Sequence, residues 1–195
     1  MRLFLVSQSE RKVLEAQSIL GPRGIDVVWK NLGIEEIQTH SLPRLVRQKT
    51  LDAFQKVRLP LLVEHTALYV RCLNGLPGGL TQSFWMGLGP ERSRPERFLR
   101  LFGKQEEQRL FACTMVGYCD GRKIVQAKGC VRGRIAPEPK GIAGFGWDRL
   151  FVPDGYSQTY AEMGDEIKDE ISMRRKALDA LCAKLEPVWR IHQTS

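Results

Sequence analysis

The sequence lacks the long apolar runs of a membrane protein. No stretch of its 195 residues reaches the roughly 18 consecutive apolar residues that a transmembrane helix needs. The apolar stretch within residues 1–7 is also shorter than the core of a secretory signal, about 7–15 residues. Low-complexity segments, internal repeats and obvious linkers are absent as well. We therefore expect a cytoplasmic protein without a membrane partner, folded as one domain over residues 1–195.

Cysteine is scarce and scattered. The spacing Cys-x-x-Cys, typical of zinc and redox sites, does not occur among the five cysteines, which are Cys72, Cys113, Cys119, Cys130 and Cys182. An odd number of dispersed cysteines is typical of buried thiols in a reducing compartment. We expect five free thiols with no metal or redox role.

Charge of one sign dominates, with a net charge of +8 and a pI of about 9.4. A basic protein attracts anionic ligands, including nucleotides. The densest basic run, residues 92–104, is interleaved with glutamates. It predicts a solvated helix face, and an anion-binding or partner surface is the alternative. No nucleic-acid-binding module is recognisable, so we expect no nucleic-acid partner.

Strands and helices alternate along the chain. Apolar periodicity predicts strands at 2–6, 25–29, 60–64, 68–73, 109–118 and 123–136. It predicts helices after Ser9, at 43–57, 81–88 and 94–103, and from about Ser172. Asp120-Gly121 is typical of a hairpin turn. This order predicts an α/β fold with a mixed sheet.

Polar groups follow the first predicted strand. Ser7 and Ser9 lie between this strand and a helix, and Lys12 lies one turn into that helix. The free N–H groups and the dipole of a helix N-terminus favour phosphate. The segment therefore predicts a phosphate site, although many α/β proteins share such features.

Charged residues also interrupt apolar patterns. Lys49 lies on the apolar stripe of its helix, so its ammonium either reaches a polar site, where Glu36 could join it, or snorkels to solvent. Glu64 and His65 lie at a strand end inside an apolar run, where ionisable groups are rare without a function. These positions are candidates for chemistry.

A glycine-rich segment, residues 141–148, combines flexible backbone with aromatic rings. Its glycines would let the backbone approach a ligand, and Phe145 and Trp147 offer faces on which a base can stack. Asp148 can accept hydrogen bonds from ring N–H groups. Two basic residues flank the start of the last helix, Lys168 and Arg174.

The order of these segments resembles the inosine triphosphate pyrophosphatase family. The most specific matches are Gly144–Asp148, Pro153–Tyr156, Thr159–Met163, Lys168 and Ser172–Arg174. The resemblance extends from Ser7 to about Leu181. It implies an elongated mixed sheet flanked by helices (α/β/α), with two lobes around a nucleotide cleft. It also implies a homodimer.

The family hydrolyses inosine-type purine nucleoside triphosphates to monophosphate and pyrophosphate with the aid of Mg²⁺. The resemblance implies that the triphosphate and base contact Ser7, Ser9, Lys12, Lys49, Phe145, Trp147, Asp148, Lys168, Met173 and Arg174. An arginine that donates to the 6-oxo group favours inosine, xanthosine or guanosine over adenosine.

The positions that carry the chemistry depart from the family. Glu36 matches its metal-binding glutamate, and Glu64 matches the first acidic residue after the strand, so both are candidate Mg²⁺ ligands. Glu64 and His65 are the candidate catalytic residues, but His65 stands where the family has a second acidic residue, its candidate base. Ser9 replaces an asparagine and Met173 a histidine. An imidazole can accept a proton, whereas Mg²⁺ prefers oxygen ligands.

These departures beside an intact base pocket favour a nucleotide sensor. Such a protein binds ITP or dITP with weakened or lost hydrolysis and reports it to a protein effector. The resemblance includes members of bacterial anti-phage systems that act in this way. The alternative is an active Mg²⁺-dependent pyrophosphatase with His65 as its base. A third reading is a diverged member that binds nucleotide weakly.

Overall fold

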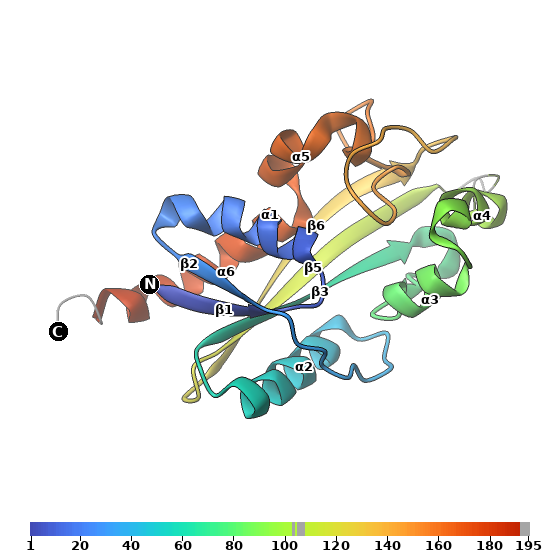
Figure 1. The fold of residues 1–195 in the computed structure, drawn as a ribbon. Coiled ribbons are helices and arrows are strands. Elements are labelled where there is room, and N and C mark those ends of the chain that lie inside the picture. Colours follow the sequence, from blue (N-terminus) through green and yellow to red (C-terminus); the bar gives the residue numbers. More distant parts are fainter. Residues whose placement is uncertain (103, 105–107, 192–195) are drawn as a thin grey trace.

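A computed structural model, which describes residues 1–102, 104 and 108–191, shows a mixed sheet with helices on both faces (Figure 1). The strands follow the order β2-β1-β3-β5-β6-β7, and β4 pairs with the outer part of β3. Their bounds are β1 Arg2–Val6, β2 Asp26–Lys30, β3 Leu61–Val70, β4 Pro77–Gly78, β5 Arg109–Cys119, β6 Ile124–Ile135 and β7 Phe151–Pro153. The first three strands are parallel, and the others join antiparallel, which confirms the expected fold class.

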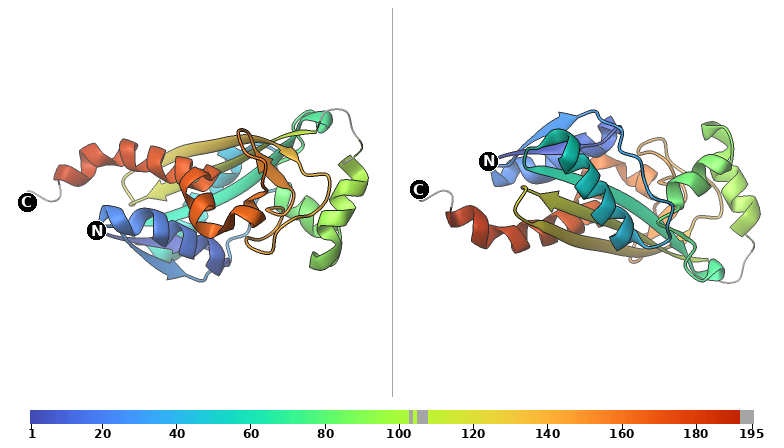
Figure 2. Two further views of the ribbon diagram at one scale, coloured as in Figure 1. Left: turned by 90° about the horizontal axis from the view of Figure 1, so that it is seen from above. Right: turned by 90° about the horizontal axis from the view of Figure 1, so that it is seen from below.

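The helices divide between the faces of this sheet (Figures 1 and 2). Their bounds are α1 Glu10–Leu20, α2 Leu42–Val57, α3 Thr81–Gly87, α4 Arg94–Phe102, α5 Tyr160–Ile171 and α6 Met173–Ile191, with short 3₁₀ turns at Gly21–Arg23, Arg71–Leu73 and Glu91–Ser93. One face is covered by α1 and α6, and the other by α2. None of the helices in these ranges has the length and apolar character needed to cross a bilayer.

The central strand β3 is buried on both faces. Successive side chains of a strand point to opposite sides. Leu62 accordingly packs with residues of α1 and α6, and Val63 with residues of α2. The sequence predicts a strand at 60–64 that continues, after a polar interruption, into residues 68–73. The structure has one continuous strand, because Glu64 and His65 find charged partners on opposite faces.

One helix of the fold was missed. Apolar periodicity predicts no element at residues 160–171, although they form α5. Thr159 caps this helix by accepting a hydrogen bond from the backbone N–H of Glu162, whose carboxylate accepts one from the N–H of Thr159. This reciprocal spacing is a known sequence signature of a helix start. The helix could therefore have been predicted.

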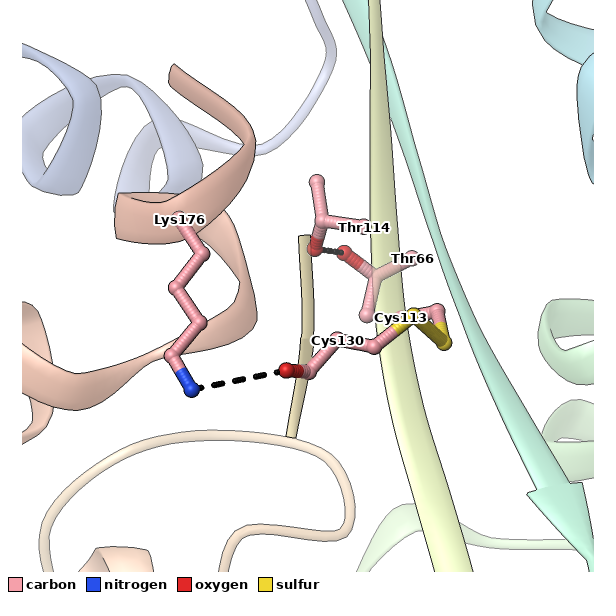
Figure 3. Close-up of a disulfide and its surroundings, with 5 residues drawn as sticks. All are labelled: Thr66, Cys113, Thr114, Cys130 and Lys176. Carbon is pink, nitrogen blue, oxygen red and sulfur yellow. Dashed lines mark hydrogen bonds between the residues drawn. A yellow bond between two sulfur atoms is a disulfide. The ribbon is translucent and has the colours of Figure 1, made fainter. Parts of the chain in front are cut away.

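A disulfide joins Cys113 to Cys130, so the expectation of five free thiols is wrong (Figure 3). A two-residue turn at Asp120-Gly121 would have paired Cys113 with Lys128. The observed hairpin has a four-residue loop that begins at Asp120 and instead pairs the two cysteines, whose Cα atoms are 4.1 Å apart. The Asp120 carboxylate accepts hydrogen bonds from the last two backbone N–H groups of this loop, which stabilises the longer connection.

Reduction of this disulfide should lower the melting temperature. The cross-link joins residues separated by 17 positions, and closing a loop of that length stabilises a fold by about 3 kcal/mol. For a chain of this size we expect a decrease of roughly 6–12 °C, measured by calorimetry with and without a phosphine reductant. Cys130→Ser should abolish the response to reductant, and Cys72→Ser should preserve it. An unchanged melting temperature would contradict the expectation.

Candidate active site

The candidate site lies at a gap in the sheet beside β3. β1 pairs only with the first two residues of β3, and β4 pairs only with Leu68 and Tyr69. Between these pairings, residues 63–67 have no neighbouring strand on that edge within the described part of the chain. Side chains instead form hydrogen bonds with the backbone groups of this edge. Lys49 Nζ, for example, donates to the carbonyl oxygen of Glu64 at 3.2 Å. The gap exposes groups from both faces of the sheet to one space.

A cavity of about 660 Å³ occupies this gap. Its volume is typical of small-molecule sites. The cavity brings together residues that are far apart in the sequence. Those predicted to act here and found in its lining are Ser7, Ser9, Lys12, Glu36, Lys49, His65, Phe145, Trp147, Asp148, Lys168, Met173 and Arg174. Glu64 is the exception, because it lies beneath Lys12 and Arg174 and is only 4% exposed.

Above the sheet, the Glu64 carboxylate binds cations from two helices. Lys12 Nζ lies 2.5 Å from its Oε1, and Arg174 Nε donates to its Oε2 at 2.9 Å. Arg174 also donates to Glu15, whose carboxylate accepts a hydrogen bond from Ser172 Oγ at 3.0 Å. These contacts join α1, β3 and the start of α6.

The charges in this cluster depend on one another. Burial alone would raise the pKa of Glu64, but the charges of Arg174 and Lys12 outweigh it and hold that pKa well below its usual range. Burial lowers the pKa of Lys12, and the attraction of Glu64 offsets this only in part. Burial would also lower the pKa of Arg174, but Glu64 and Glu15 outweigh it and raise that pKa. Removal of one partner would therefore leave an uncompensated buried charge.

Glu15 is a member of the site that sequence reasoning missed. It is 6% exposed and lies on α1, three residues after Lys12 and beside the apolar positions Val13 and Ala16. Residues three apart lie on the same side of a helix. The available sequence signal was that Glu15 lies beside the buried apolar stripe, on the same side of the helix as Lys12.

Below the sheet, His65 pairs with Glu36. The imidazole Nδ1 lies 3.2 Å from Glu36 Oε2, and Lys49 Nζ donates to Glu36 Oε1 at 2.6 Å. Because an ionised carboxylate only accepts hydrogen bonds, the proton of the neutral ring belongs on Nδ1. His65 Nε2 is buried and has no hydrogen-bond partner among the described residues, so this tautomer leaves it a free lone pair.

The glycine-rich segment forms another wall. Asp148 Oδ2 accepts hydrogen bonds from the Phe145 N–H at 2.8 Å and from Lys168 Nζ at 2.6 Å. Lys168 Nζ lies 4.5 Å from the centre of the Phe145 ring, and the Arg11 guanidinium lies 5.9 Å from it. Gly144 has a φ of +73°, and an added Cβ would clash with the Asp148 carboxylate. Glycine is therefore required at that position.

The lysines predicted to meet phosphate are all paired with carboxylates. The pairs are Lys12–Glu64, Lys49–Glu36 and Lys168–Asp148. An ammonium group has three N–H donors, so each pairing can position a lysine while leaving donors for ligand oxygens. Ser9 precedes α1 and makes no side-chain capping bond, and its backbone N–H donates to Ser7 Oγ at 3.1 Å.

The arrangement of the predicted metal ligands is less favourable. Among residues 1–102, 104 and 108–191, no three His, Cys, Asp or Glu side chains cluster closely enough to hold a metal ion. Glu36 lies on the His65 side of β3, whereas the Glu64 carboxylate faces α1 and α6. Joint coordination of Mg²⁺ by these two residues stays a prediction.

Comparisons with known proteins agree with the geometry. A family model described as "Ham1 family" matches residues 3–184. The chain is 39% identical to inosine triphosphate pyrophosphatase 2 of Trypanosoma cruzi over 184 residues, 93% of this chain and 91% of that protein. It is 34% identical to a dITP/XTP pyrophosphatase of Methanopyrus kandleri over 180 residues, 92% and 93% of the two chains. Among solved structures, a HAM1 protein from Coxiella burnetii matches with a TM-score of 0.83 and 23% identity, covering 96% of this chain and 99% of that one, which shows the shared fold.

Loss of the Glu36 charge should reduce stability except in strong acid. Burial would raise the pKa of Glu36, but the His65 hydrogen bond and the Lys49 charge lower it from 4.5 to about 2. Because the folded pKa lies below the unfolded value, this stabilisation is complete above about pH 4.5 and disappears as pH falls through about 2. Urea unfolding of the natural chain and Glu36→Gln should differ by about 2–3 kcal/mol at pH 7, and by progressively less below pH 4.5.

The matched control for this titration is Glu170→Gln, which alters an exposed carboxylate of α5. Its effect on the free energy of unfolding should be small. A difference between natural chain and Glu36→Gln that stays constant from pH 7 to pH 2.5 would show that the ion pairs of Glu36 do not stabilise the fold.

Proposed function

The chain belongs to the Ham1 family, and from that premise we propose that it binds an inosine-type purine nucleoside triphosphate and hydrolyses it to monophosphate and pyrophosphate. The observation that carries this proposal is a single cavity lined by four cationic side chains and an aromatic, glycine-rich wall. Relatives named as pyrophosphatases of dITP, XTP and inosine triphosphate cover more than nine-tenths of the chain. They favour hydrolysis over the sensor function.

In this proposal the triphosphate lies near the N-terminus of α1. Free N–H groups of this helix and the remaining donors of Lys12 and Lys49 would contact phosphate oxygens. The cations are already positioned by carboxylates, so binding would require little rearrangement of their side chains. A triphosphate is the ligand whose charge and length suit several separate cations.

The base would lie against the 145–148 wall. Phe145 and Trp147 supply faces for stacking, and Asp148 supplies an acceptor for a ring N–H. Arg174 uses Nε on Glu64 and Nη1 on Glu15, which leaves the N–H groups of Nη2 for the 6-oxo oxygen of a purine. This donor would have no partner on adenine, whose 6-amino group is itself a donor.

His65 would act as the general base. Glu36 holds the proton on Nδ1, so Nε2 can accept a proton from the water that attacks the α-phosphorus. Carboxylate–imidazole pairs position the histidine of hydrolases in the same manner. Nε2 is covered in the ligand-free chain, so the cavity walls must shift when nucleotide binds.

Magnesium would be held by Glu36 together with phosphate oxygens of the nucleotide. Mg²⁺ is often bound by one or two carboxylates plus substrate phosphates, and a carboxylate has lone pairs beyond those used by Lys49 and His65. Glu64 is less suited, because it is buried and both of its oxygens already contact cations. When bound, the ion would neutralise charge on the phosphates.

A nucleotide sensor stays the second candidate. The observation that favours it is Met173, a buried thioether that cannot donate the hydrogen bond of the family's histidine. In that case the cavity would bind ITP or dITP without efficient turnover and report it to a protein effector. Homodimerisation is part of either proposal.

The natural chain should release pyrophosphate from ITP, dITP and XTP in the presence of Mg²⁺. We expect kcat/KM for these substrates to exceed that for ATP at least tenfold, which corresponds to about 1.4 kcal/mol in transition-state stabilisation. Calorimetry with the same nucleotides separates binding from turnover. Tight dITP binding without pyrophosphate release would favour the sensor, and equal kcat/KM for ATP would overturn the base assignment.

Substitution of His65 should identify the base. His65→Ala should lower kcat by roughly 10²–10⁴-fold with little change in nucleotide affinity, because the imidazole would act only on the attacking water. His40→Ala, which removes an exposed histidine outside the cavity lining, is the matched control. His65→Asp should also slow the natural enzyme. A faster His65→Asp variant would mean that the natural chain is catalytically weakened and would support the sensor.

A further inference from the structure

The Cys113–Cys130 disulfide lies outside the nucleotide cavity but on the sheet face that carries His65. Residues of β3 and β5 pair directly across the sheet, Ala67 with Cys113 and His65 with Met115. Cys113 therefore lies next to Met115 on this face of β5, and Met115 is the direct partner of His65, which lines the cavity. The hydroxyls of Thr66 and Thr114 meet on the opposite face (Figure 3).

The two bonded cysteines differ in exposure. Cys113 is 3% exposed and packs among Val63, Ala67 and Met115 in the core beneath α2. Cys130 is half-buried at the margin of the same cluster. Cys130 is therefore the more accessible of the two bonded cysteines for a reagent from solvent.

The surroundings of Cys130 are cationic. Lys128 and Arg132 flank it at the two neighbouring positions on the same face of β6, and both are exposed. Their direct partners on β5 are the uncharged Met115 and Phe111. The view from below shows β6 running beside α2 (Figure 2). An anionic reagent would be attracted to this sulfur.

We propose that Cys130 is a thiolation site for a small anionic thiol. The thiolate attacks Sγ of Cys130, the bond to Cys113 breaks, and the electron pair leaves on Cys113 Sγ, which takes a proton from water. Cys130 then carries the small thiol as a mixed disulfide. A second thiolate releases it, so two small thiols are oxidised to their disulfide while the protein disulfide is reduced to two thiols. The small disulfide drives the reverse reaction.

The exchange changes the chain locally. Backbone pairing of β5 with β6 continues on both sides of the cross-link, from Arg109↔Arg134 to Cys119↔Ile124. The modified protein therefore keeps its fold but loses the covalent connection beside the cavity wall. This proposal does not depend on nucleotide hydrolysis.

The first experiment counts thiols in the full chain purified without reductant. Alkylation after denaturation, followed by mass spectrometry, should modify three cysteines before reduction and five after it. Five modified cysteines before reduction would overturn the proposal, because no disulfide would be present to exchange.

The second experiment compares three thiols of similar size and different charge: 2-mercaptoethanesulfonate, 2-mercaptoethanol and cysteamine. Rate constants per thiolate should decrease in that order, by at least about threefold per unit charge at low ionic strength, and should converge in 1 M salt. Peptide mapping should place the adduct on Cys130. Equal rate constants, or an adduct on Cys113, would overturn the proposal.

Substitutions of the two basic residues test whether their charges cause the rate differences among the three thiols. Lys128→Gln with Arg132→Gln should compress the differences among the three thiols, and Arg100→Gln, which alters an exposed residue of α4, should leave them unchanged. Cys113→Ser leaves Cys130 as a free thiol, which should form the same adduct with the disulfide of mercaptoethanesulfonate. Failure of that variant to form the adduct, with its circular dichroism spectrum unchanged, would show that Cys130 is not accessible.

Discussion

The Glu64 carboxylate connects the parts of the molecule on which the candidate site depends. It binds Lys12 from α1 and Arg174 from α6, and Arg174 binds Glu15 in turn. Burial of an ion costs several kcal/mol unless partners compensate it, so these groups can be buried only together. The positions of Lys12 and Arg174 in the cavity wall therefore follow from a contact between two helices and the central strand.

A gap in the sheet turns this structural cluster into an accessible site. A continuous sheet would separate the groups above β3 from those below it. Because β1 ends early and β4 is short, Lys12 above and Lys49 below reach one cavity. Carboxylates hold these cations in the ligand-free chain, so their orientation is largely set before an anion arrives. Such preorganisation lowers the cost of binding and of charge stabilisation in a transition state.

Local sequence patterns predicted the positions of helices, whereas pairings between residues far apart in the sequence were not predicted. The apolar stripes of α1 and α2 gave their positions to within a residue or two, and the candidate residues were found around one cavity. The disulfide was missed because its register depends on two extra residues in a loop. Glu15 was missed because its partner Arg174 lies 159 residues away. The local signal, a carboxylate beside the apolar stripe of α1, does not identify that partner.

The surroundings of His65 suit its proposed role as a proton acceptor. A carboxylate can contact a metal and a water without further support, whereas an imidazole needs an acceptor at one nitrogen to present a lone pair at the other. Glu36 supplies that acceptor, and the His65 hydrogen bond together with the Lys49 charge lowers the pKa of Glu36 and keeps it ionised. The pairing of His65 with Glu36 therefore supports the proposal that His65 accepts a proton at Nε2.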